Sequence, residues 1–466
     1  MRVGLLMMGL SLALLWAWLG RYPALHADAL TLSEVWRGIQ EGAGVGRWLF
    51  STACSLFPDL GATALASLWT QDLVAWQRWH GFFIGMGAAW GAARLMRSLW
   101  DLSAWQARSF AAMGLALGLL LCQPSGFRDL FSPGHHGWAC VMALWAWAWA
   151  LRQEEGPSRW SYSLWLALIW GLTWASDSFF LLWGLLPVLI LALGSSKWAR
   201  DRMTATVLAS WPLKWLALRW LRSTGAMVGV FRWSYAWQHA GERWPAFEQG
   251  MTPLLTEQRW ILLAAALSLG LWLWHARLEK RARLPLLAWA FSLGASLLLC
   301  LLAGLGPRYL LFPVWCLILT LPALVALNWP ALSAGVLMVP ALGAVLWLAP
   351  TQAPGADAME LRQAAWIDRL SIQYGLTQGW SDYFHSRPLR LLSQRHLQVL
   401  PMISAAPDHL DPYLWVVDRG IFPANLVLPR PQFVVINGLD PAIVSKRLGQ
   451  AKERLQGEGL EVWIYE

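Results

Sequence analysis

Charged residues are scarce in this chain. Only 14% of its 466 residues are Asp, Glu, Lys or Arg, whereas 57% are hydrophobic. Soluble globular domains carry about 25% charged residues, so the composition excludes an ordinary soluble protein. We therefore expect a multi-pass membrane protein.

Paired cysteines and the common nucleotide-binding and hydrolase motifs are also missing. The five cysteines stand singly, without CxxC spacing, and fit small apolar residues in packed helices better than metal or redox sites. Without a GxGxxG loop, a Walker motif or HExxH, nucleotide-driven transport and zincin chemistry lose support. The absence of GxSxG argues against a lipase.

Tryptophan, in contrast, is abundant, and basic residues gather in short loops. Many of the 37 Trp stand where apolar runs end, as in the aromatic belts of membrane proteins. The net charge of +9 would suit nucleic-acid binding, but the Arg residues are grouped between apolar runs. Such grouping indicates membrane topology, so no nucleic-acid partner is expected.

Apolar runs predict about eleven transmembrane helices. The predicted spans are 3–19, 80–99, 109–123, 137–151, 160–175, 179–194, 203–221, 258–276, 285–305, 309–327 and 331–349. The run 60–73 is short, and counting it as a span would place Arg94, Arg97 and Arg108 outside. We therefore interpret it as interfacial or partly re-entrant.

With the N-terminus in the cytoplasm, four basic loops all fall on the cytoplasmic side. The opposite, outer side then receives the long loop 20–80, several short loops and everything after Pro350. Amphipathic runs at 359–374 and 381–392, a further helix at 441–456 and short β-branched runs follow. We expect a transmembrane domain, 1–349, and a small α+β domain outside the membrane, 350–466.

Carboxylates and imidazoles on the outer side are the first candidates for chemistry. Asp59 follows Phe57-Pro58 in the first outer loop, and a carboxylate at the edge of a bilayer is costly unless it is paired, hydrated or functional. His135 and His136 precede a predicted span, where they can donate or accept hydrogen bonds or bind a metal. A hydrated helix start is the structural alternative.

Two further candidates stand at tight turns on the same side. Asp177 follows Ser176 between two apolar runs, where it could cap the next helix or belong to a site. Arg308 ends a span on the outer side, where positive charge serves no topological purpose. Its fork of donors suits a phosphate, although it could also extend to lipid headgroups.

Together these features resemble the GT-C superfamily of integral-membrane glycosyltransferases, which use polyprenyl-phosphate-linked sugars. The resemblance rests on the long first outer loop with Asp59, the sequence 132–136, the Ser176-Asp177 turn, the sequence 308–310 and the outer C-terminal domain. It covers the architecture of the whole chain through short motifs.

The resemblance implies a role for each candidate. Asp59 would be the general base, and Arg308 would bind the lipid phosphate. His135, His136 and Asp177 would line the donor or acceptor site. The family usually has paired acidic residues early in this loop, where this chain offers only Glu34. Glu34 therefore joins the expected binding residues, and the need for a divalent metal stays open.

The implied partners are membrane lipid, a polyprenyl-phosphate-sugar donor and a glycan, lipid or protein acceptor. The expected location is a bacterial inner membrane, with the C-terminal domain in the periplasm. One alternative is a transporter or flippase of a lipid-linked amphiphile, although such proteins often contain related halves, which we do not find in this sequence. The other is a non-catalytic membrane scaffold.

Overall fold

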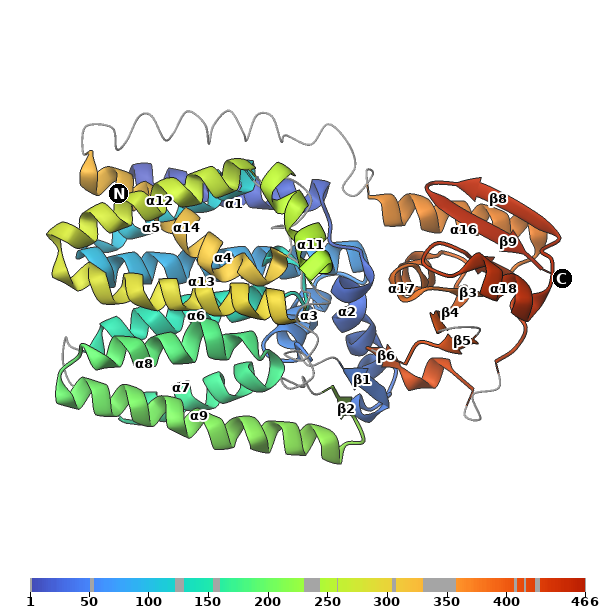
Figure 1. Ribbon diagram of the computed structural model, residues 1–466, viewed down its shortest axis with the longest axis horizontal. Coiled ribbons are helices and arrows are strands. Elements are labelled where there is room, and N and C mark those ends of the chain that lie inside the picture. Colours follow the sequence, from blue (N-terminus) through green and yellow to red (C-terminus); the bar gives the residue numbers. More distant parts are fainter. Residues whose placement is uncertain are drawn as a thin grey trace.

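The computed structural model describes residues 2–50, 54–121, 130–153, 160–229, 244–257, 259–303, 307–329, 358–405, 409–414, 416–423 and 428–465. Within these ranges the chain is mostly helical, and most strands lie in its C-terminal part. Figure 1 shows a bundle of helices beside a smaller C-terminal domain. The expected domain boundary near 350 and the expected span 331–349 lie outside the described residues.

Most helices lie side by side in the bundle (Figure 1) and share one continuous apolar core. They are α1 (Arg2–Arg21), α4 (Leu73–Trp100), α5 (Ala104–Leu121), α6 (Gly137–Leu151), α7 (Trp160–Ser176), α8 (Leu186–Leu193), α9 (Lys197–Ser223), α12 (Arg259–Leu278), α13 (Arg283–Ala303) and α14 (Leu311–Asn328). Short helical turns and one more helix connect them, namely η4 (Leu181–Leu185), η6 (Lys280–Ala282), η7 (Pro307–Leu310) and α11 (Trp244–Glu257).

Tryptophans fill much of this core, and the indole N–H groups of some of them find acceptors inside it. Trp147 donates to the carbonyl oxygen of Trp183 at 2.8 Å, and Trp183 donates to Ser296 Oγ at 2.8 Å. Both indoles are fully buried. A buried indole without a partner would lose the hydrogen bond that it makes to water, so these contacts permit large aromatic side chains between helices.

The structure corrects the expected number of eleven clearly apolar membrane spans. Among the described helices, three are long and apolar enough to cross a membrane, namely Arg259–Leu278, Lys280–Leu302 and Leu311–Asn328. The segments 137–151 and 181–193 are apolar but shorter. Other bundle helices, such as α4, draw their apolar character from Gly, Ala and Trp and also carry Arg. Such residues favour insertion less than Leu or Ile does.

Between α1 and α4 the chain forms a compact segment. We call it the outer segment, because the sequence predicts it on the outer side of the membrane. Its elements are α2 (Ala27–Gln40), η1 (Val45–Arg47), β1 (Trp48–Phe50) and α3 (Asp59–Ser67). Because α3 has only nine residues, it is about 13 Å long, against a bilayer core of about 30 Å. This length agrees with the interpretation that 60–73 does not cross the membrane.

A three-stranded sheet connects this outer segment to distant parts of the chain. Strand β1 is central: it pairs in parallel with β2 (Met227–Val228) and antiparallel with β6 (Val417–Asp418). Arg47 adds two side-chain hydrogen bonds to Asp418, at 3.0 and 2.7 Å. The C-terminal domain is thereby joined to the first outer segment through its backbone as well as through side chains.

The C-terminal domain is built on a six-stranded mixed sheet, ordered β5-β4-β3-β7-β9-β8. Alternate residues of β7 face opposite sides: Phe433 and Val435 pack with α16 and α17, and Val434 packs with α18. The elements are α16 (Met359–Tyr374), β3 (Gln378–Ser381), α17 (Tyr383–Leu392), β4 (Gln398–Ala405), β5 (His409–Pro412), η9 (Arg419–Ile421), β7 (Phe433–Val435), α18 (Pro441–Leu448), β8 (Glu453–Gly457) and β9 (Leu460–Ile464).

The predicted elements of this domain are partly confirmed. The helix expected at 359–374 has these bounds. The helix expected from 381 begins two residues later, because Asp382 caps it by accepting the His385 N–H at 3.1 Å. The helix expected at 441–456 is too long. It ends at Leu448 because Gly449 has a φ of 86°, and β8 follows.

Candidate functional site

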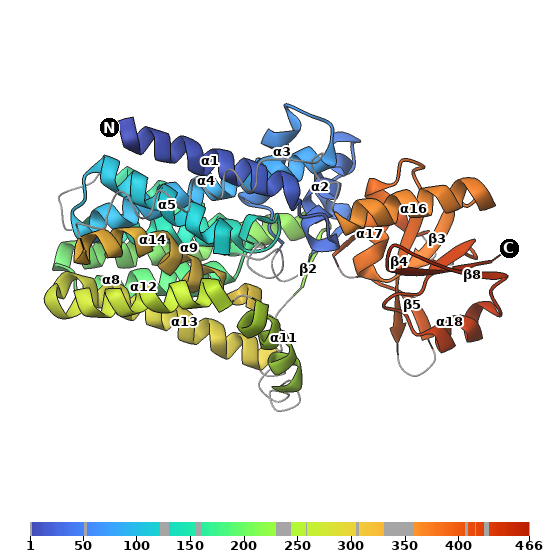
Figure 2. The same cartoon turned by 90° about the horizontal axis from the view of Figure 1, so that it is seen from above.

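The residues proposed from the sequence lie at the end of the bundle that faces the C-terminal domain. Figures 1 and 2 both place α2 and α3 between the bundle and that domain. Asp59 begins α3 and Glu34 lies in α2, while the two histidines precede α6 and Asp177 follows α7. Hydrogen bonds between these loops, described below, bring Asp59, the two histidines and Asp177 into one region, whereas Glu34 faces the C-terminal domain.

Asp59 accepts a hydrogen bond at one carboxylate oxygen, Oδ1, and none from the described residues at the other. Its Oδ1 accepts the backbone N–H of Gly134 at 3.1 Å, which joins the start of α3 to the turn before α6. Its side chain is 8% exposed. Among the described residues, no group donates a hydrogen bond to Oδ2. Oδ2 therefore keeps its capacity to accept a hydrogen bond.

His80 lies beside Asp59 without neutralising it. Its Nε2 is 3.5 Å from Asp59 Oδ1 but accepts the indole N–H of Trp138 at 3.2 Å, so this nitrogen carries no proton. Its Nδ1 lies 3.1 Å from Thr63 Oγ1, whose own hydroxyl donates to the carbonyl oxygen of Asp59. Nδ1 is therefore the donor to Thr63 Oγ1. His80 Nε2, as an acceptor, donates no hydrogen bond to Asp59 Oδ1.

Next to Asp59, a cluster of two histidines and one carboxylate could hold a metal ion. His26, Asp28 and His135 each offer one ligand atom, and these atoms lie within 4.8 Å of one another. His135 Nε2 is 3.8 Å from Asp28 Oδ2, and Asp28 keeps 29% of its side chain exposed. Two imidazoles and a carboxylate suit Zn²⁺ and related ions better than Mg²⁺, which prefers oxygen ligands.

The sequence interpretation included His135 but missed His26 and Asp28 as members of a cluster. The His26-Ala27-Asp28 spacing was visible in the sequence. His26 caps α2, with Nδ1 accepting the Ala29 N–H at 3.5 Å. This leaves Nε2 as its ligand atom. The two ends of the cluster are 107 residues apart or more, and only the fold brings them together.

The C-terminal domain contributes a group to the cluster. Tyr383 donates its hydroxyl proton to Asp28 Oδ1 at 2.7 Å, and Arg387 Nη1 donates to the same hydroxyl at 2.9 Å. Burial raises the pKa of Tyr383, Arg387 opposes this rise and Asp28 adds to it. The phenol therefore stays protonated and keeps donating. Such hydrogen bonds orient a carboxylate and tune its affinity for a metal.

His136 and Asp177 form a buried pair beneath aromatic rings. Their Nδ1 and Oδ2 atoms are 2.7 Å apart. Asp177 Oδ1 also accepts the Phe179 N–H at 2.9 Å, so the capping role considered from the sequence holds alongside the contact with His136. The rings of Phe179 and Tyr309 lie 4.7 and 5.1 Å from the His136 ring. Both side chains are about 7% exposed, so this buried pair supports the neighbouring residues of the site.

The Ser176-Asp177 turn also positions the residues that precede Asp59. Ser176 Oγ accepts the Phe57 N–H at 2.8 Å, and the Ser176 carbonyl accepts the Ser55 N–H at 2.9 Å. These two contacts join the residues before α3 to the end of α7. The position of Asp59 therefore depends on both neighbouring loops.

Glu34 has a different partner from the one expected. It is buried beside Arg387, whose Nε lies 2.7 Å from Glu34 Oε2, and Arg390 contacts its other oxygen. Burial alone would raise the pKa of Glu34, but the two guanidinium groups together hold it below its ordinary value. Glu34 thus joins the C-terminal domain to α2, and the structure does not bring it to Asp59.

Arg308 lies in the turn η7 at the same end of the bundle, since the ring of its neighbour Tyr309 packs on His136. The side chain of Arg308 lies outside the described part of the structure. Its predicted contact with phosphate therefore stays a prediction. Comparisons of the chain with family models, curated proteins and solved structures find no match.

Proposed function

We propose that this protein is a membrane glycosyltransferase of GT-C type that moves a sugar from a polyprenyl-phosphate donor to an envelope acceptor at the outer face of the membrane. One observation carries the proposal: Asp59 and the His26, Asp28 and His135 cluster meet at a single turn, Gly134-His135. A base and a cation-binding site are thus adjacent at one end of an apolar bundle.

The membrane arrangement is part of the same proposal. Three described helices are clear candidate spans, and the other long helices lie alongside them in Figure 1. We propose that these neighbours cross the bilayer too, with charged groups directed toward other helices or the interfaces. The C-terminal domain then lies outside the membrane beside the site.

Asp59 would act as the general base on the acceptor. Its Oδ2 takes the proton of an acceptor hydroxyl while that oxygen forms a bond to the anomeric carbon of the sugar. The bond from this carbon to the phosphate oxygen breaks, and the electron pair leaves with the lipid phosphate. Because His80 Nε2 accepts the Trp138 N–H and does not donate to Asp59, it leaves the carboxylate able to take this proton.

The leaving phosphate needs positive charge nearby. Arg308 is the predicted guanidinium donor on this side. A divalent ion held by His26, Asp28 and His135 would supply further charge to a phosphate, and the partly exposed Asp28 is the solvent-facing member of the cluster. Tyr383 fixes the carboxylate of Asp28 for that purpose.

Metal binding by this cluster can be measured without an activity assay. Zn²⁺ added to the purified, chelator-treated protein is expected to bind, and His26→Ala or His135→Ala is expected to weaken binding by about 100-fold or more, since even groups behind the ligands contribute 10–100-fold. Isothermal titration calorimetry gives the affinities. His409→Ala, an exposed histidine in β5, is the matched control, and equal affinities in all variants would contradict the assignment.

The proposed activity is tested by profiling envelope glycans and lipid-linked intermediates in cells that lack the protein. Loss of one sugar from a glycan, restored by the wild-type gene, is the expected result, and it identifies the sugar. Complete glycans with a lipid-linked precursor stranded on one leaflet would instead indicate the transporter. No change in either would indicate the scaffold.

A further inference from the structure

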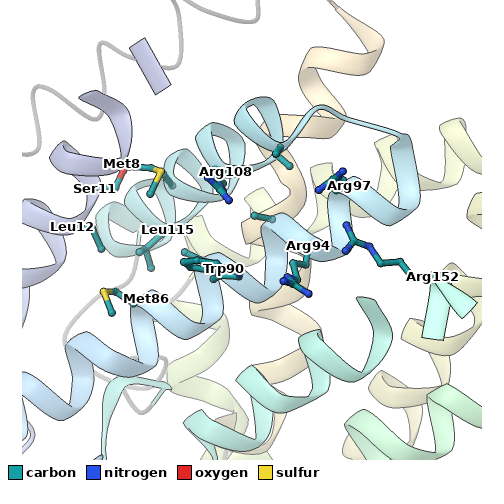
Figure 3. Close-up of a pocket in the computed structure, with 15 residues that line it drawn as sticks. Met8, Ser11, Leu12, Met86, Trp90, Arg94, Arg97, Arg108, Leu115 and Arg152 are labelled. Atoms are coloured by element: carbon teal, nitrogen blue, oxygen red, sulfur yellow. The ribbon is translucent and has the colours of Figure 1, made fainter. Parts of the chain in front are cut away.

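A cavity between α1, α4 and α5 combines basic and apolar walls away from the candidate site. Its volume is about 260 Å³. Figure 3 shows arginines toward one end and apolar side chains toward the other, with Trp90 between them. The basic end comprises Arg94, Arg97, Arg108 and Arg152, and the apolar end includes Met8, Leu12, Met86 and Leu115. The cavity is therefore amphipathic.

This cavity lies toward the end of the bundle opposite the C-terminal domain. Helix α4 runs from Leu73, beside α3, to Trp100, so Arg94 and Arg97 lie in its last two turns. Arg108 follows in the first turns of α5, and Arg152 follows α6 directly. In the membrane orientation predicted from positive charge, this end faces the cytoplasm.

The arginines are held by aromatic and polar groups. Arg94 lies 5.0 Å above the ring of Trp145, and Arg108 lies 5.5 Å from the rings of Trp90 and Trp105. Among the described residues, neither guanidinium forms an ion pair with a carboxylate. Stacking on an aromatic face leaves the N–H edge of a guanidinium able to bind an oxyanion.

A second apolar groove adjoins the same arginines. It has a volume of about 540 Å³ and shares Arg94 and Arg152 with the first cavity. Its walls are rich in tryptophan, including Trp145, Trp149 and Trp165. The basic cluster therefore lies between two apolar grooves, and among the described residues that line them none is acidic.

We infer that this region binds an anionic phospholipid of the cytoplasmic leaflet. The phosphate contacts Arg94 and Arg108, and one acyl chain occupies each groove. A single negative charge with two apolar chains matches a basic cluster flanked by two grooves, and basic pockets between helices on this side of a membrane bind such headgroups. The site is separate from the proposed transfer chemistry, so it stands or falls independently of that activity.

Native mass spectrometry of the detergent-purified full chain tests the inference. Phosphatidylglycerol is expected to bind, and phosphatidylcholine with the same acyl chains is expected to bind at least tenfold more weakly. Arg94→Gln with Arg108→Gln is expected to weaken phosphatidylglycerol binding about 30-fold, because each arginine near an anionic headgroup contributes roughly fivefold. Arg108→Gln alone, at an exposed position, is expected to cost about fivefold and guards against misfolding of the double variant.

The matched control removes two exposed arginines at the same end of the bundle but outside both grooves, Arg277→Gln with Arg281→Gln. This variant is expected to bind phosphatidylglycerol like wild type. Equal binding of the two phospholipids, or an equal loss in the control, would overturn the inference. Displacement of phosphatidylglycerol by an equimolar polyprenyl phosphate would also overturn it, because the pocket would then belong to the donor lipid.

Discussion

Replacing Asp59 with Asn is expected to lower sugar transfer by roughly 10²–10⁴-fold, the usual contribution of a general base. The substitution removes the negative charge but keeps an oxygen at Oδ1 that can accept the Gly134 N–H. The fold and the turn before α6 should therefore survive. Transfer is measured in membranes with the donor identified from the glycan profile.

Two comparisons make this result specific. Asp72→Asn changes an exposed carboxylate at the start of α4, where Asn caps a helix as well as Asp does, and is expected to leave transfer unchanged. Asp28→Asn is expected to reduce Zn²⁺ affinity together with transfer. Near-normal turnover in Asp59→Asn would remove the base role from this residue, whatever the other variants do.

Replacing Glu34 with Gln is expected to destabilise the junction between α2 and the C-terminal domain by about 3–5 kcal/mol, the range for breaking a buried ion pair. The change leaves Arg387, 2% exposed, and its neighbour Arg390 without their shared carboxylate. Hydrogen exchange of α2 and α17 should accelerate before that of the bundle helices. Mass spectrometry of the exchanged peptides measures both.

Two further variants control the interpretation of the Glu34→Gln result. One breaks an exposed ion pair, and the other removes all three charges at the junction. Arg362→Met breaks the exposed pair with Glu458 and is expected to cost less than about 1 kcal/mol. Glu34→Leu with Arg387→Met and Arg390→Met removes all three charges and should recover part of the loss, since it also removes the hydrogen bonds that Arg387 donates to the carbonyl oxygens of Ala27 and Val416. A cost in Glu34→Gln no larger than in Arg362→Met would contradict the expected role.

Acid should act on the same junction. The folded-state pKa of Glu34 lies below its ordinary value, so its contribution to stability is fully present above the ordinary Glu pKa of about 4.3. It is lost as the pH falls through the lowered folded-state pKa. The protection of α2 and α17, corrected for the intrinsic pH dependence of amide exchange, should therefore fall at strongly acidic pH, and the Glu34→Leu triple variant should lack this contribution.

Local sequence patterns predicted the local features of this molecule. The amphipathic period of 359–374 gave the bounds of α16, and the Ser-Asp turn between apolar runs indicated the cap formed by Asp177. The misplaced end at 441–456 had a visible signal in Gly449, a residue suited to positive φ. Fewer described helices than the predicted eleven are clearly apolar enough to cross a membrane, because helices rich in Trp and Gly, such as α4, are only weakly hydropathic.

Long-range partners were beyond the reach of such patterns. Glu34 and Arg387 are 353 residues apart, so no periodicity relates them. The cluster of His26, Asp28 and His135 needs the turn before α6 to close on α2. Tyr383 adds a hydrogen bond from another domain. The sequence could therefore name candidate residues that lie at one end of the bundle, whereas their pairing is a property of the tertiary fold.

The order of synthesis gives the three-stranded sheet a further consequence. Arg47 directly precedes β1, and its partner Asp418 lies in β6, the strand that pairs with β1. The ribosome adds Asp418 to the chain 371 residues after Arg47. At about 5–20 residues per second, this interval is roughly 20–70 seconds. During that time the nascent chain has an outer segment whose central strand lacks one neighbour. The strand at Val417–Asp418 thus completes a sheet begun at Trp48–Phe50, and the ribosome must add the 371 residues that follow Arg47, up to Asp418, before that sheet is assembled.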